Sequence, residues 1–93
     1  MNRIEFVNII KNRPDTIEKI QENFINFMAL YNLISSYNIS VIDMDNCTFT
    51  ITFDRCEDTN QIFNVLPSDM YMYNTILNLE KSISGNSIII KIS

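Results

Sequence analysis

The sequence predicts an α+β fold in which two N-terminal helices pack on an antiparallel sheet of two β-hairpins. Before residue 36, apolar residues recur every three or four positions, which is the period of an amphipathic helix. From residue 39 the period changes to two, which is the period of a half-buried strand. The chain has 93 residues, so we expect a single domain over residues 1–93.

Two helices are expected before the sheet. Residues 3–12 place apolar side chains at helical spacing, and Pro14 ends that segment. Asp15, followed three residues later by Glu18, gives a capping-box start signal for a second helix from about 16 to 36. The second half of this helix is apolar on nearly every side, so we expect it to form the spine of the core.

The first hairpin is expected from strands at residues 39–44 and 47–54. Apolar and polar residues alternate strictly in the second of these strands. A tight turn at residues 45 and 46 would place Ile42 opposite Phe49, so that apolar side chains meet on one face of the hairpin.

The residues after the first hairpin predict a short helix. Asp58 with Gln61 three residues later gives a second start signal of the capping-box type, and Pro67 ends the segment. We therefore expect a helix over residues 58–66 that connects the two hairpins.

The segment from 69 to 83 has two interpretations. Read as a strand, it pairs with residues 87–93 across a turn that begins at Gly85, and this register places Ile83 opposite Ile88. We favour this interpretation, which gives about four strands in all. The alternative is a helix over 69–83 and a sheet of three strands.

The composition argues against most catalytic chemistry. The chain has no histidine, which is the commonest general base and a common metal ligand. Its single glycine cannot build a phosphate-binding loop, and Cys47 and Cys56 have no metal-ligand spacing. Asp43 begins a segment that starts like a calcium loop, but Thr48 stands where that loop needs glycine. We therefore expect no enzyme activity, no cofactor and no metal.

The chain is expected to act in the cytoplasm, which would be the host cytoplasm if a phage encodes it. No apolar run approaches the roughly 20 residues that cross a bilayer, and no secretory signal is visible. The spacing of the two cysteines does not indicate a disulfide framework, and such cysteines are typically free thiols in a reducing compartment. We accordingly expect no contact with a membrane.

The charges are unevenly distributed, although the formal net charge is only −4. Six acidic residues fall between residues 43 and 69, a segment with one basic residue. Such a run usually faces water or caps helices, but it can also form a surface that meets a basic partner. We expect two patches at opposite ends of a strand. The candidate partner-binding residues are Asp43, Asp45, Asp54, Glu57, Asp58 and Asp69.

These observations predict a small acidic, non-enzymatic protein-binding module. Its partner would be a protein with a basic surface, because a pI near 4.5 opposes direct contact with nucleic acid. This profile is expected of a phage- or mobile-element-encoded inhibitor that blocks a host protein, including one that imitates nucleic acid with carboxylates. The alternative is a homo-oligomeric structural or assembly subunit, such as a homodimer. It would associate through the apolar excess of the second helix or through the Ile-rich strand 88–92 at a sheet edge.

Overall fold

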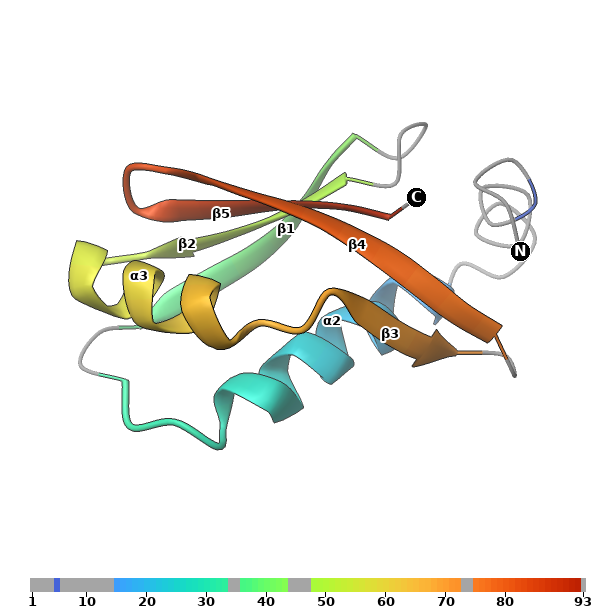
Figure 1. The fold of residues 1–93 in the computed structure, drawn as a ribbon, viewed down its shortest axis with the longest axis horizontal. Coiled ribbons are helices and arrows are strands. Elements are labelled where there is room, and N and C mark those ends of the chain that lie inside the picture. Colours follow the sequence, from blue (N-terminus) through green and yellow to red (C-terminus); the bar gives the residue numbers. More distant parts are fainter. Residues whose placement is uncertain (1–4, 6–14, 34–35, 44–47, 73–74, 93) are drawn as a thin grey trace.

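The computed structural model describes residue 5 and residues 15–33, 36–43, 48–72 and 75–92. These residues form an α+β fold with two helices and a five-stranded antiparallel sheet, so the predicted fold class is confirmed (Figure 1). The elements are α2 (Asp15–Met28), β1 (Tyr37–Asp43), β2 (Thr48–Phe53), α3 (Cys56–Val65), β3 (Asp69–Met72), β4 (Thr75–Ser84) and β5 (Ser87–Ile92).

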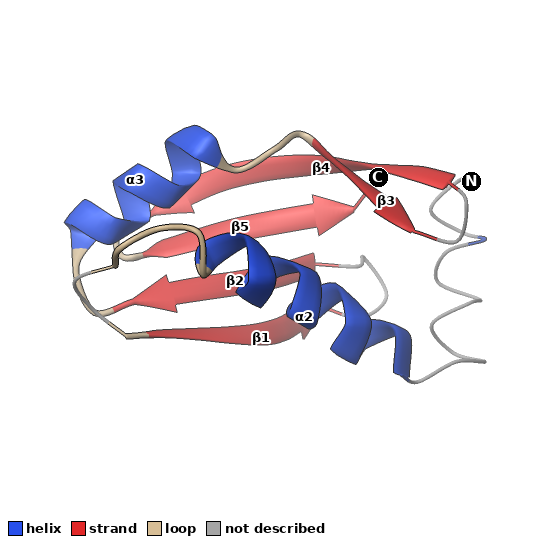
Figure 2. Cartoon of the chain, turned by 90° about the horizontal axis from the view of Figure 1, so that it is seen from below, coloured by secondary structure: helices blue, strands red, loops and turns tan. Residues whose placement is uncertain are grey.

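The strands lie in the order β1-β2-β5-β4-β3, and every neighbouring pair is antiparallel. Both helices lie on the same face of this sheet, as the two views in Figures 1 and 2 show. Helix α2 crosses β1 and β2, and α3 lies beside β4 at one end of the sheet (Figure 2). The described part of the chain is therefore a layer of helices on one sheet.

The hydrophobic core lies between the helices and the sheet. Alternate residues of β2 and β5 point toward the helices, which buries one side of each strand. The ring of Phe24 on α2 meets the ring of Phe49 on β2 edge to face, with centroids 6.2 Å apart. The buried apolar residues are Ile20, Phe24, Met28, Phe49, Ile51, Phe53, Ile62, Leu66, Leu77, Leu79, Ile88, Ile90 and Ile92.

The predicted helix lengths need correction. The expected first helix, 3–12, lies outside the described residues apart from Glu5, which is helical. Helix α2 begins near the expected position but ends at Met28, far short of residue 36. Fourteen residues span about 21 Å, close to the length of strands of six or seven residues, whereas the predicted helix would extend well beyond them. The apolar residues after Met28 belong to a connection in which Leu30 is 77% exposed.

The predicted register of the first hairpin is wrong by one residue from Tyr37 to Val41, whereas Asp43 lies opposite Thr48 as that register requires. Val41 lies opposite Phe49, and Ile42 is 53% exposed on the other face. An irregularity between Val41 and Asp43 inserts one extra residue near the end of β1. Because of this bulge, Tyr37, Ile39 and Val41 face the helices, and the two β-branched residues among them pack next to the core.

Helix α3 begins at Cys56, two residues earlier than predicted, and its last turn closes at Leu66, directly before Pro67. The segment that follows is extended, so the alternative helix over 69–83 is wrong. It contains two strands, β3 and β4, which are paired with each other. The second predicted hairpin is therefore a three-stranded meander.

The pairing of β4 with β5 has the predicted register, with Ile83 opposite Ile88. Gly85 begins the turn at a φ of 58°. This left-handed backbone conformation favours glycine, because a side chain there would be strained. One correct turn residue was enough to place every side chain of this strand pair on the correct face.

Candidate partner-binding surface

The structure separates the six candidate acidic residues by exposure. Asp54, Glu57 and Asp69 are exposed, and Asp43 is partly buried at the end of β1. Asp58 is 1% exposed in the first turn of α3, so its side chain is not available to a partner. Asp45 lies outside the described residues.

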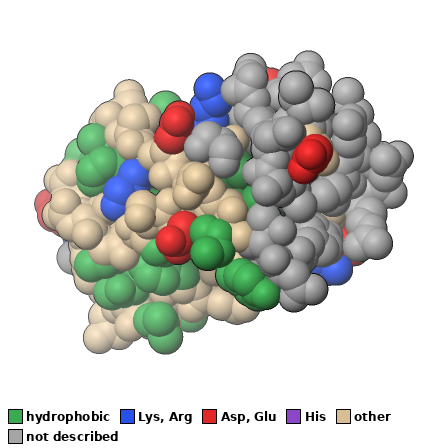
Figure 3. All heavy atoms as spheres, turned by 45° about the vertical axis from the view of Figure 1, so that its right-hand side comes forward, with side chains coloured by type: hydrophobic (Ala, Val, Ile, Leu, Met, Phe, Trp, Pro, Cys, Tyr) green, Lys and Arg blue, Asp and Glu red, His purple; other side chains and the backbone are tan. Residues whose placement is uncertain are grey.

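The exposed carboxylates do not form one surface. Asp43 and Asp54 lie at opposite ends of the β1–β2 hairpin, as the sequence predicted. Asp69 begins β3, on the opposite edge of the sheet from β1. On the face shown in Figure 3, the acidic side chains of the described residues lie singly among polar and apolar ones. A continuous acidic stripe is therefore absent from the described part of that face.

Asp54 and Glu57 lie close in sequence at the junction of β2 and α3, and we call this pair the acidic corner. The Ser36 hydroxyl donates a hydrogen bond to Oδ2 of Asp54 at 2.9 Å. Oε2 of Glu57 lies 3.9 Å from Nε of Arg55, and both side chains are largely exposed. An ion pair this exposed and this long contributes little to stability, so Glu57 is accessible to a second cation.

The local backbone explains why acidic residues occur here. The first turn of α3 contains Glu57 and Asp58, and carboxylates are favourable near the positive end of a helix. The residue before the helix, Arg55, makes no side-chain capping hydrogen bond. Helix stabilisation therefore accounts for part of the acidic run, whereas Asp54 lies before the helix and bonds to the start of β1 instead.

A shallow recess adjoins the acidic corner at the start of β1. It has a volume of about 350 Å³ and combines Asp54 with neighbouring polar residues of β1 and β2. Such a lining can accept a cationic side chain whose charged end meets the Asp54 carboxylate. The residues that line it are Ser36, Tyr37, Asn38, Thr52 and Asp54.

The sequence did not indicate this recess. Three of its residues, Ser36, Tyr37 and Asn38, precede the predicted start of the first strand at 39. The recess also depends on the pairing of Asn38 with Thr52, which the predicted register did not contain. A signal was present in the alternation of Tyr37, Ile39 and Val41, which extends the period of two back to residue 37.

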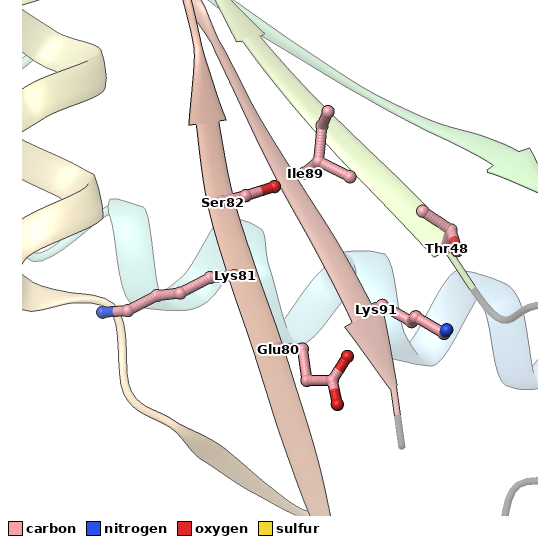
Figure 4. Close-up of a pocket in the computed structure, with 6 residues that line it drawn as sticks. All are labelled: Thr48, Glu80, Lys81, Ser82, Ile89 and Lys91. Atoms are coloured by element: carbon pink, nitrogen blue, oxygen red, sulfur yellow. The ribbon is translucent and has the colours of Figure 1, made fainter.

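A second recess of about 350 Å³ lies on the sheet face that no described helix covers. Figure 4 shows Glu80 and Lys91 on neighbouring strands beside Thr48, Ser82 and Ile89. The amine of the remaining lining residue, Lys81, points away from this group in Figure 4. Small hydroxyl side chains recur on this face, namely those of Ser40, Thr48, Thr50, Thr52, Ser82, Ser84 and Ser87.

The structure contradicts dimerisation through the Ile-rich strand at a sheet edge. Strand β5 lies between β2 and β4, so its backbone is paired on both sides. Ile88, Ile90 and Ile92 are buried under the helices. The continuous apolar run reflects a central strand, which sequence alone does not distinguish from an edge strand.

Among the described residues, no group of three or more His, Cys, Asp or Glu side chains is placed to hold a metal ion. None of the described helices has the length and apolarity needed to cross a bilayer. Comparisons with protein families, with curated proteins and with solved structures find no match to this chain. The surface itself is therefore the basis for any functional conclusion.

Proposed function

We propose that this chain is a small, non-enzymatic protein-binding module whose partner presents a basic surface to the acidic corner. The observation that carries the proposal is the exposure of Asp54 and Glu57 together with the recess that Asp54 lines. A cationic side chain of the partner that enters the recess would meet Asp54, and a second one would meet Glu57.

The overall charge supports the same kind of partner. The chain has eleven Asp and Glu residues and seven Lys and Arg residues, which gives a formal net charge of −4. An excess of one sign attracts a partner of opposite sign over several ångströms and speeds encounter, and salt screens this attraction. Affinity for the partner is therefore expected to fall as the salt concentration rises.

Under this proposal the chain is an inhibitor that occupies a basic surface of a host protein in the cytoplasm. That surface could be one that normally binds nucleic acid, since basic surfaces serve that purpose. The separation of Asp43, Asp54 and Asp69 favours local docking at the acidic corner over imitation of an evenly spaced phosphate backbone.

The test is a double charge reversal at the acidic corner, Asp54→Lys with Glu57→Lys. Asp58 is left unchanged, because a lysine in its buried position would unfold the start of α3 and obscure the result. The control is Glu18→Lys with Glu22→Lys on the exposed side of α2, which alters the net charge equally. Circular dichroism of both variants confirms that they are folded.

Immobilised protein is incubated with native host lysate, and captured proteins are quantified by mass spectrometry. We expect the corner variant to retain the partner at least about tenfold less than the control variant at low salt, because desolvated charge pairs contribute strongly to binding. We also expect capture by the unmodified protein to fall steeply from about 50 to 300 mM NaCl. Equal capture by both variants, or capture that salt does not change, would refute the proposal.

A further inference from the structure

The outer edge of β1 carries backbone groups that its neighbour β2 does not use. In an antiparallel pair, residues alternate between facing the partner strand and facing away from it. Asp54 donates its N–H to Ser36 O at 3.2 Å, whereas Phe53 donates its N–H to Asn86 O at 2.9 Å. Even-numbered residues of β2 therefore face β1, and odd-numbered residues face β5.

This alternation defines which groups of β1 point outward. Because Asn38 lies opposite Thr52 and Ile39 opposite Ile51, the even-numbered residues of β1 bond to β2. The N–H and C=O groups of Tyr37, Ile39 and Val41 consequently point to the open side of β1. They form a row of donors and acceptors that an additional strand could pair with.

The side chains of the same three residues are incompletely covered. Tyr37, Ile39 and Val41 pack against the core but stay partly exposed, whereas the inward residues of β2 and β5 are buried. No Pro, Lys or Arg occurs from Tyr37 to Asp43, and the bulge lies only at the far end of the strand. Proteins usually protect edge strands with such features, so this edge is suited to pairing.

Other parts of the sheet edge are less suited to pairing. Strand β3 has four residues, and charged Asp69 begins it. The second half of β4 is flanked by α3, and the amine of Lys81 reaches the carbonyl oxygens of Phe63 and Leu66 there. Among the described strands, β1 therefore offers the longest accessible edge.

We propose that an extended segment of the basic partner adds to β1 as a sixth strand of the sheet. This inference rests on the proposed function and names the part of the partner that binds. The segment would carry β-branched residues beside Tyr37, Ile39 and Val41, since such neighbours complete the burial of an edge. It would carry Lys or Arg at its ends, where β1 is flanked by Asp54 and Asp43.

Charge favours this occupant over a second copy of the chain. Two copies paired antiparallel about Ser40 would bring Asp43 of each toward the Asp54 end of the other. Acidic residues of both copies would then gather at each end of the paired strands, and like charges repel each other. A strand with cationic ends replaces this repulsion with attraction.

The test uses three kinds of synthetic peptide and the full chain. The probe is acetyl-Lys-Thr-Val-Thr-Val-Thr-Lys-amide, and a second peptide has Glu in place of both Lys residues. The third kind is the probe with methyl groups on the backbone nitrogens of its valines. Its matched control carries the methyl groups on the backbone nitrogens of the threonines instead. If the two valines lie opposite Ile39 and Val41, their N–H groups point toward β1 and those of the threonines point away.

We expect saturating probe to slow amide hydrogen exchange of Tyr37, Ile39 and Val41 at least about tenfold, because these amides gain acceptors. Exchange of Asn38 and Ser40, which already bond to β2, is expected to stay unchanged. The Glu peptide and the valine-methylated probe should bind at least about tenfold more weakly, and the threonine-methylated probe within about threefold of the parent.

Two results would overturn the inference. One is equal binding of the two methylated probes, or exchange at the three amides that saturating probe does not change. The other is protection of the same amides without peptide that rises with protein concentration, which would mean that a second copy occupies the edge. Neither result would prevent a partner in the lysate from binding at the acidic corner. The failure of this inference can therefore be distinguished from the failure of the proposed function. Equal edge protection by the Lys and Glu peptides would instead contradict the role of charge.

Discussion

Lys81 is the cationic side chain whose contacts are best defined among the described residues. It lies on the helix-facing side of β4, in the same row as Leu77 and Leu79. Its amine donates hydrogen bonds to the carbonyl oxygens of Phe63 and Leu66 at 2.8 and 2.7 Å, and it lies 5.0 Å from the centre of the Phe63 ring. These carbonyl groups belong to the end of α3, where a positive charge is favourable.

We expect Lys81→Met to destabilise the fold by roughly 1–3 kcal/mol, because the substitution keeps the apolar stem but leaves two carbonyl groups without their charged donor. Lys91→Met is the matched control, since Lys91 lies on the other face of the sheet. Its expected effect is within about 0.5 kcal/mol. Urea unfolding of both variants measures the difference, and equal midpoints would show that Lys81 does not stabilise α3.

The exposure of individual acidic residues could not be inferred from the sequence. Asp58 and Glu57 are adjacent acidic residues in the first turn of the same helix, and both were candidate partner-binding residues although Asp58 also belongs to a helix start signal. The helix turns one toward the protein and the other toward solvent, because residues one apart on a helix point in different directions. Only the packing of α3 on the sheet shows that Asp58 is buried.

At the scale of elements, strand β5 shows how alternation divides an apolar run. Ile90 is 0% exposed under the helices, whereas its neighbour Ile89 lies on the uncovered face and is partly exposed. The helix-facing residues of this strand are all Ile, whereas the other face carries Ser87, Ile89 and Lys91, so Ile89 is the one position where residue type does not indicate the face.

We expect Ile90→Ala to destabilise the protein by roughly 2–5 kcal/mol, since it removes three buried carbon atoms from the core. Ile89→Ala is expected to destabilise the protein by about 1 kcal/mol or less, because the partly exposed side chain contributes mainly through its preference for the strand conformation. Thermal or urea unfolding of the two variants checks the orientation of β5. A larger effect at residue 89 would mean that the strand is turned the other way.

The elements differed in how well the sequence predicted them, and each difference has a physical cause. The β4–β5 register was correct because Gly85 specifies the turn locally. The β1–β2 register was wrong because a bulge has no clear sequence signal. Helix α2 was predicted too long because the apolar pattern continues past Met28 into a connection, where tertiary packing replaces helical periodicity.

At the scale of the whole molecule, strand order determines which surfaces are available. The sequence predicted acidic patches at two ends of the hairpin, and the structure places Asp43 and Asp54 at those ends. The β1 edge and its recess could not be predicted in the same way. They depend on β5 pairing between β2 and β4, which is a long-range contact that local patterns do not encode.

We expect the purified protein to be a monomer in solution. The net charge of −4 opposes self-association, and β5, the most apolar strand, is already paired on both sides. Light scattering after size exclusion should give the chain mass of 10.9 kDa at loading concentrations between about 10 and 500 µM. A mass that rises toward twice this value with concentration would favour the alternative of a homo-oligomeric subunit.

Strand β4 has its two partners one after the other along its length. Thr75 to Asn78 pair with β3, and Leu79 to Ser84 pair with β5. The two halves meet at Leu79, whose N–H donates to Ser68 O at 2.9 Å while its Cα lies opposite Ile92. The sheet is therefore stepped, and β3 can detach as a separate opening unit without breaking any bond of the β4–β5 ladder.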